Sequence, residues 1–137
     1  MTLTVQIPQK FRNRNIYSES DFQRMIKKER FRSDRSNYGF SLILFNISLF
    51  FDTEENIFSF LENIIMRIRI SDEIGWYNPR NIGLILPDTK LNGAHNLAKQ
   101  IVSASNSDAF DIPYNIFVYP NFWWTPENDV ENRSFFE

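Results

Sequence analysis

The stretch Glu73-Ile-Gly-Trp-Tyr-Asn-Pro-Arg-Asn-Ile-Gly-Leu-Ile-Leu-Pro87 decides the fold of this chain of 137 residues. Two runs rich in apolar and aromatic residues, 73–77 and 82–86, flank the polar segment Asn78 to Asn81. Asn and Pro are turn residues, and the flanking runs have the length and composition of strands. The stretch therefore predicts a hairpin of two antiparallel strands.

Helices and strands alternate on both sides of this hairpin. Phe40 to Ile47 is a nearly continuous apolar run, which is typical of a strand covered on both faces. Apolar residues at helical spacing follow Asp52 and Thr53, and again follow Asp88 and Thr89, and these polar residues are the expected N-caps. The predicted elements are a helix from near Ser18 to before Asn37, a strand over 40–47, a helix after Thr53, the hairpin, a helix over about 91–101, and a strand over 114–119.

The order of these elements defines the fold class. Without the first helix it is β-α-β-β-α-β, the ferredoxin-like pattern of the α+β class, in which two helices pack on one face of an antiparallel sheet. We expect one domain over residues 18–119, an irregular lead-in over 1–17, and an aromatic and acidic tail over 120–137.

Composition limits the range of functions. The chain has no Cys, which excludes a disulfide framework and a thiolate metal site. No apolar run reaches the roughly 18 residues of a membrane helix, so a cytoplasmic protein without a membrane span is expected. Lys10 to Arg35 holds nine basic and four acidic residues, whereas the tail holds four acidic residues and one Arg. No nucleic-acid motif accompanies the basic segment, so nucleic acid is not an expected partner.

The segments Arg69-Ile-Ser-Asp-Glu-Ile-Gly-Trp-Tyr77, Ile82-Gly-Leu-Ile-Leu-Pro-Asp-Thr89 and Gly93-Ala94 are similar to the GGDEF family, the diguanylate cyclases. The pattern of that family is Arg-x-x-Asp, a strand, a Gly-Gly-Asp/Glu-Glu-Phe hairpin, a strand ending in Leu-Pro, and a helix. The resemblance covers about residues 20–119. It implies the same β-α-β-β-α-β core and a function connected with cyclic di-GMP.

The chain departs from the family at the positions that the resemblance makes catalytic. In place of the signature stand Asn78, Pro79, Arg80, Asn81 and Ile82. The two carboxylates that would hold Mg²⁺ are replaced by Asn81 and by the uncharged stretch Asn46 to Phe50. Because Mg²⁺ prefers carboxylate and phosphate oxygens, we expect no metal, no cofactor and no catalytic residue.

These departures predict that the chain is not an enzyme. The expected function is that of a degenerate GGDEF-like module that regulates or binds a protein partner, in bacterial signalling or exopolysaccharide biosynthesis. The exopolysaccharide setting is what the resemblance implies, since a similar degenerate form lies beside exopolysaccharide and sugar-transferase genes in some bacteria. An enzyme with unrelated chemistry on the same scaffold is another possible function, but no residue of the sequence favours it.

An alternative function comes from Arg69 and Asp72, which precede the signature position at the spacing of the family's product-inhibition site. The resemblance implies that they bind cyclic di-GMP, since Arg can grip phosphate or guanine with its planar fork. The other interpretation is structural, with Asp72 starting a strand and Arg69 paired to an acid. Both stay open.

The tail and the basic helix are the remaining candidates for contacts. Phe122-Trp123-Trp124 and Phe135-Phe136 give the tail an aromatic character that is common at interfaces. The tail either covers the sheet or binds a protein partner. The basic helix leaves open whether two copies pair as a homodimer.

Overall fold

The computed structural model describes residues 16–48, 53–105 and 112–120. Its elements are β1 (Ile16–Tyr17), α1 (Glu19–Ser36), β2 (Phe40–Asn46), α2 (Glu54–Ile65), β3 (Glu73–Asn78), β4 (Asn81–Pro87), α3 (Leu91–Ser105) and β5 (Tyr114–Tyr119). None of the helices among these residues is long and apolar enough to cross a lipid bilayer.

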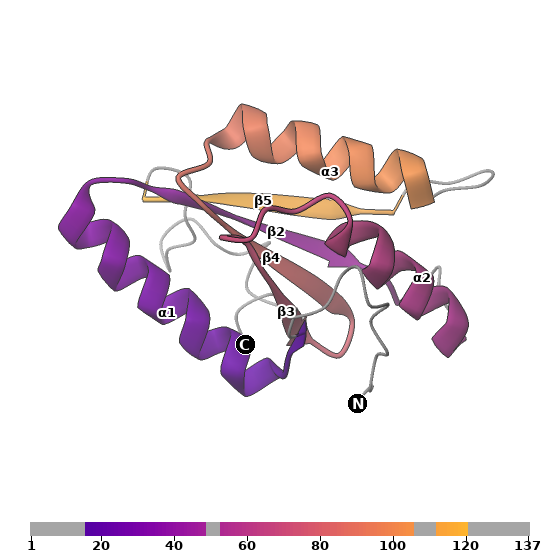
Figure 1. Ribbon diagram of the computed structural model, residues 1–137. Helices are drawn as coiled ribbons and strands as arrows, with labels where there is room; N and C mark the ends of the chain where they lie inside the picture. Colours follow the sequence, from indigo (N-terminus) through magenta and orange to yellow (C-terminus); the bar gives the residue numbers. More distant parts are fainter. Residues whose placement is uncertain (1–15, 49–52, 106–111, 121–137) are drawn as a thin grey trace.

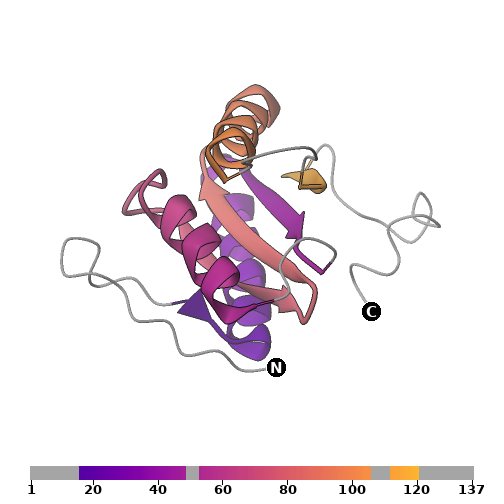
Figure 2. The ribbon, with the colours of Figure 1, turned by 90° about the vertical axis from the view of Figure 1, so that its right-hand side faces the viewer.

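The strands form one sheet in the order β1-β3-β4-β2-β5. The last four strands pair antiparallel, which confirms the predicted α+β fold and its β-α-β-β-α-β core. The sequence did not predict β1, which pairs parallel with β3 through Ile16 and Tyr17. In the view of Figure 2, the short β1 (indigo) and β5 (orange) lie at opposite edges of the sheet.

Both faces of the sheet are covered. In Figure 1, α1 lies on one side of the sheet, whereas α2 and α3 lie on the other. Side chains of β2 alternate accordingly: Ile43 and Phe45 belong to the core beneath α2 and α3, whereas Leu42 and Leu44 belong to the core beneath α1. This two-sided burial explains why the sequence of β2 is a continuous apolar run.

The N-terminal ends of the helices follow the sequence with one exception, and α3 continues to Ser105, beyond its predicted end near residue 101. Ser18 caps α1 by accepting from the Asp21 N–H, and Thr53 caps α2 in the same way through Asn56. The predicted cap of α3 at Asp88 or Thr89 is wrong, because that helix begins only at Leu91. The Thr89 hydroxyl instead donates to the Pro87 carbonyl at 3.0 Å, so it is committed to the end of β4.

A glycine pair brings α1 close to the sheet. Gly75 and Gly83 are opposite each other on β3 and β4, and the fully buried Phe22 ring of α1 lies on them. A Cβ atom on Gly83 would lie 2.5 Å from Cε2 of Phe22, and one on Gly75 would lie 2.5 Å from its Cδ1. The two glycines therefore set how closely α1 approaches β3 and β4.

Candidate functional site

The hairpin between β3 and β4 ends in a cluster of amide side chains. The Asn78 Oδ1 accepts from the Arg80 N–H at 2.9 Å and from the Asn81 Nδ2 at 3.0 Å. Across the sheet, Asn46 is the register partner of Asn81, and its Oδ1 accepts from the Ser48 N–H at 3.0 Å. The tip is thus held by side-chain amides, without a carboxylate from Asn78 to Asn81.

This cluster does not fit the magnesium site that the family resemblance implies. Asn81 is 5% exposed, and its Oδ1 accepts no hydrogen bond from the described part of the chain. It is a neutral oxygen, as is the Asn46 Oδ1, which Ser48 already occupies. Mg²⁺ needs carboxylate or phosphate charge, and the described residues contain no group of three or more His, Cys, Asp or Glu that could hold a metal.

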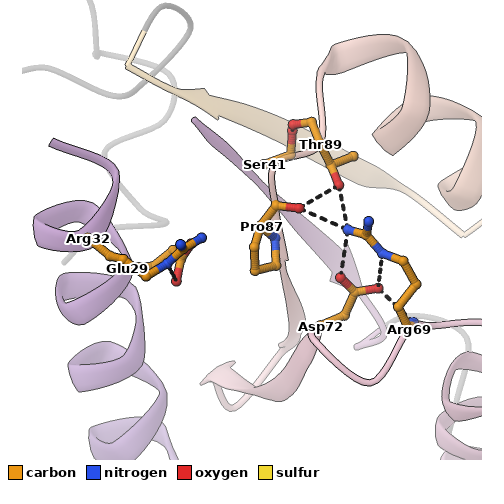
Figure 3. A network of polar contacts seen from close by, with 7 residues as sticks. All are labelled: Glu29, Arg32, Ser41, Arg69, Asp72, Pro87 and Thr89. Carbon is orange, nitrogen blue, oxygen red and sulfur yellow. Dashed lines mark hydrogen bonds and ion pairs between the residues drawn. The ribbon is translucent and has the colours of Figure 1, made fainter. Parts of the chain in front are cut away.

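Arg69 and Asp72 are brought together by the structure, and they bind each other. Asp72 is 1% exposed and accepts from the Arg69 N–H at 2.8 Å and from its guanidinium at 3.0 Å. The same guanidinium donates to the Pro87 carbonyl at 2.9 Å and to the Thr89 hydroxyl at 2.8 Å. Figure 3 shows this network joining the loop before β3 to the end of β4.

A groove of about 790 Å³ runs along α1 beside this network. Its far wall is formed by Ser71, Glu73, Ile85 and Pro87, so the Arg69 network holds two of its wall segments in place. The residues of α1 that line it are Arg24, Met25, Lys27, Lys28, Glu29, Phe31, Arg32 and Arg35. In Figure 3, Glu29 and Arg32 project from α1 toward Pro87 across this space.

The groove combines apolar surface with positive charge. Met25, Phe31, Ile85 and Pro87 are its apolar lining, and Phe31 is 60% exposed although it is a large aromatic residue. Such exposure of a large apolar side chain within a hollowed surface is typical of a binding site.

The cations of the groove are only partly neutralised by acidic neighbours. Arg24 pairs with Asp21, and Arg32 with Glu29 at 2.7 Å, a hydrogen bond that raises the pKa of Arg32. Lys27, Lys28 and Arg35 form no ion pair with any residue that the structure describes. The groove therefore has, beside its apolar lining, three exposed cations that pair with no described acidic side chain; they are called the uncompensated cations below.

The sequence contains a pattern that indicates this groove, but the spacing of the buried apolar residues does not reveal it. The residues Arg24, Lys28, Phe31 and Arg35 recur at spacings of four, three and four, so they form one stripe of α1. That stripe is separate from the buried stripe of Phe22 and Ile26. An aromatic residue within a basic helical stripe is the pattern that would have indicated the groove.

Solved structures with the same fold include GGDEF domains. A DGC protein from Thermotoga maritima has a TM-score of 0.64 at 17% identity, covering 80% of this chain and 86% of that one. The GGDEF domain of PA1120 from Pseudomonas aeruginosa has a TM-score of 0.66 at 12% identity, with 80% of each chain covered. No family model matches the sequence, and no curated protein is significantly similar to it. This chain therefore has the GGDEF-domain fold.

These structures correct one expectation. An active GGEEF domain of a diguanylate cyclase from Vibrio cholerae shares the fold, with a TM-score of 0.62 at 16% identity over 76% of each chain. The prediction that the chain is not an enzyme is wrong in its ground, because the same fold belongs to an active diguanylate cyclase domain and so gives no reason to exclude activity. At such identities the similarity establishes the fold alone, and fold does not determine function.

Part of the predicted surface lies outside the described residues. This holds for the aromatic residues of the tail beyond Pro120 and for Leu49 and Phe50 after the end of β2. The described site thus consists of the α1 groove, the Arg69 network that bonds to Pro87 in its far wall, and the amide cluster at the hairpin tip.

Proposed function

We propose that this chain is a regulatory GGDEF-like module of bacterial signalling that acts by binding a protein in the α1 groove. The observation that carries the proposal is the combination of the exposed Phe31 with the uncompensated charges of Lys27, Lys28 and Arg35 in one groove. We also propose that the module acts in exopolysaccharide biosynthesis, and identifying its protein partner tests this part of the proposal.

The groove selects a partner by charge and by apolar contact. Three uncompensated cations favour an acidic segment, while Met25, Phe31 and Ile85 favour apolar or aromatic side chains in the same segment. A structure with the same fold supports a protein ligand: the diguanylate cyclase SiaD from Pseudomonas aeruginosa was solved in complex with its activator SiaC. That match has a TM-score of 0.53 at 16% identity and covers 80% of this chain and 50% of that one.

A photo-crosslinking experiment in the cells that produce this chain tests the proposal. With benzoylphenylalanine in place of Phe31, we expect a covalent adduct with a second protein, attached through an acidic and apolar segment. Lys27→Glu together with Lys28→Glu should remove the adduct, because the reversed charges repel that segment. Mass spectrometry identifies the partner and the crosslinked residue.

The matched control reverses two exposed lysines outside the groove, Lys90→Glu and Lys99→Glu, with the same change in net charge. This variant should keep the adduct. A crosslinker at the exposed Met66 should not give the same product. Equal adducts from positions 31 and 66, or none from position 31, would contradict the proposal.

A second candidate is a receptor for cyclic di-GMP that uses Arg69 and Asp72. The observation that favours it is the Arg69 side chain, which is 56% exposed although it is anchored by the buried Asp72. Among proteins of this fold, the GGDEF domain of DgcB from Caulobacter crescentus was solved in complex with c-di-GMP, with a TM-score of 0.55 and 10% identity. In this chain Asp72 accepts from Arg69 and orients it, and the exposed guanidinium would be the group that contacts a phosphate or guanine.

Titration calorimetry with cyclic di-GMP tests the second candidate. We expect a binding heat for the parent chain that disappears in Arg69→Lys, because Lys keeps the charge beside Asp72 but lacks the planar fork. Arg67→Lys is the control, since Arg67 is an exposed neighbour whose side chain bonds only to Asn63 among the described residues. Absence of heat in the parent at ligand excess would exclude a receptor, and equal heats in both variants would remove Arg69 from the site.

A further inference from the structure

We infer that the C-terminal segment of this chain, residues 121–137, docks into the α1 groove of the same molecule and competes there with the protein partner. The inference rests on the proposed function for the partner, but the docking itself can be tested on the purified chain alone. It assigns to the groove an internal ligand, and hence a means of regulation.

The segment has the chemistry that the groove selects. It holds four acidic residues and one Arg, and these acidic residues are Glu127, Asp129, Glu131 and Glu137. Aromatic residues lie on either side of most of this charge, at Phe122-Trp123-Trp124 and at Phe135-Phe136. The groove presents the complement, with Lys27, Lys28 and Arg35 uncompensated beside its apolar lining. Complementary charge sets the register of such a contact, and aromatic side chains provide most of its apolar area.

The path of the chain starts at the C-terminal turn of α1, at the end of the helix that the groove reaches with Arg35. The hydroxyl of Tyr119, at the end of β5, donates to the Asp34 carboxylate of α1 at 2.6 Å, a bond that raises the pKa of Tyr119. Asp34 is adjacent in sequence to Arg35, which lines the groove. The last described residue, Pro120, therefore follows a strand that is already fixed against the C-terminal turn of α1.

The length of the segment is sufficient to reach along the whole groove. Seventeen residues follow Pro120, and an extended chain of that length spans up to about 55 Å. The part of α1 from Arg24 to Arg35 that lines the groove is about 17 Å long, and a helix with its side chains is about 10–12 Å across. Rounding the end of α1 therefore leaves enough chain to fill the groove.

Covalent attachment favours this segment over the same segment of a second copy. A segment tethered a few residues from its site has an effective concentration in the millimolar range. A second copy must supply the same contacts at its own, lower concentration. An external partner must in turn displace the tethered segment, which lowers its apparent affinity and makes the groove a regulated site.

Paramagnetic labelling of the full chain tests the inference. Because the sequence has no Cys, Ser134→Cys gives a single attachment point for a nitroxide label. We expect the amide signals of Lys27, Lys28, Phe31 and Ser71 to lose most of their intensity, and those of α2 and the exposed face of α3 to keep theirs. Lys27→Glu with Lys28→Glu should restore the signals, whereas Lys90→Glu with Lys99→Glu should not.

The outcomes separate the alternatives. Unchanged groove signals in the labelled parent would overturn the inference, as would broadening centred instead on Asn37 to Gly39 beside the end of β5. A mixture of isotope-labelled chain without nitroxide and nitroxide-labelled chain without isotope reports contacts between copies, and broadening there would assign the groove to a second copy. None of these results depends on the crosslinked partner. The docking of residues 121–137 can therefore be disproved without disproving the proposed protein partner, and the partner can be disproved without disproving the docking.

Discussion

Replacing Gly83 with alanine is expected to lower the free energy of unfolding by about 2 kcal/mol, as overpacking of a filled core does. The added Cβ would lie 2.5 Å and 2.7 Å from two atoms of the Phe22 ring and 3.2 Å from the Leu44 Cδ2. Phe22 is fully buried between α1 and the sheet, so the ring can give way only by displacing other core side chains. Urea unfolding followed by circular dichroism should show a lower midpoint with an unchanged slope.

Two further variants make the interpretation specific. Gly93→Ala, in the exposed first turn of α3, should change the free energy of unfolding by less than about 1 kcal/mol, because its Cβ meets only the Thr89 Cγ2, at 3.3 Å. Phe22→Leu should lessen the additional cost of Gly83→Ala, because the smaller side chain leaves room for the methyl group. Equal losses in Gly83→Ala and Gly93→Ala would contradict the close packing of Phe22 on the glycine pair.

Replacing Arg69 with alanine is expected to destabilise the fold by about 2–3 kcal/mol, because it leaves the buried carboxylate of Asp72 without its guanidinium partner. Asp72 is 1% exposed, and in the variant it would keep the Arg69 N–H, a backbone donor, but lose the charge of the side chain. The Pro87 carbonyl would lose a donor at the same time. Equilibrium unfolding in urea gives the change directly.

The structure contains a close comparison for this variant. Arg24 and Asp21 form an ion pair of the same spacing on α1, with side chains that are 73% and 45% exposed. Arg24→Ala should therefore cost less than about 0.5 kcal/mol, as is usual for an exposed pair. If the two arginine variants proved equally stable, the Arg69 network would have no role in holding the groove wall.

The fold could be predicted because turn residues and apolar runs within short windows of the sequence indicate most of its helices and strands. Asn78 to Asn81 stop two apolar runs, and the length of each run fits a strand, so the hairpin follows from turn chemistry alone. The two-sided burial of β2 followed equally from its unbroken apolar composition. By contrast, β1 has only two residues, and its pairing with β3 rather than any pattern of its own makes it a strand.

The site was less predictable because it depends on distances between elements. The spacing of Arg-x-x-Asp is the same whether Asp72 contacts a ligand or Arg69. Only the folded structure shows that Asp72 accepts hydrogen bonds from Arg69. The groove requires α1 to lie beside Ile85 and Pro87, which are some fifty residues away in sequence. That arrangement is set by Phe22 and the glycine pair, a contact that no local window of the sequence contains.

The central position of β2 has a consequence for synthesis of the chain. This strand leaves the ribosome after α1, whose residues Phe22 and Ile26 can already shield Leu42 and Leu44. Its backbone partners come much later, first β4 and finally β5, which ends at Tyr119. Until then this apolar strand has two open edges, the state in which nascent chains aggregate or recruit chaperones. Because α1 is basic, well capped and synthesised before β2, it can cover one face of β2 with a charged, soluble helix while the edges of that strand are still unpaired.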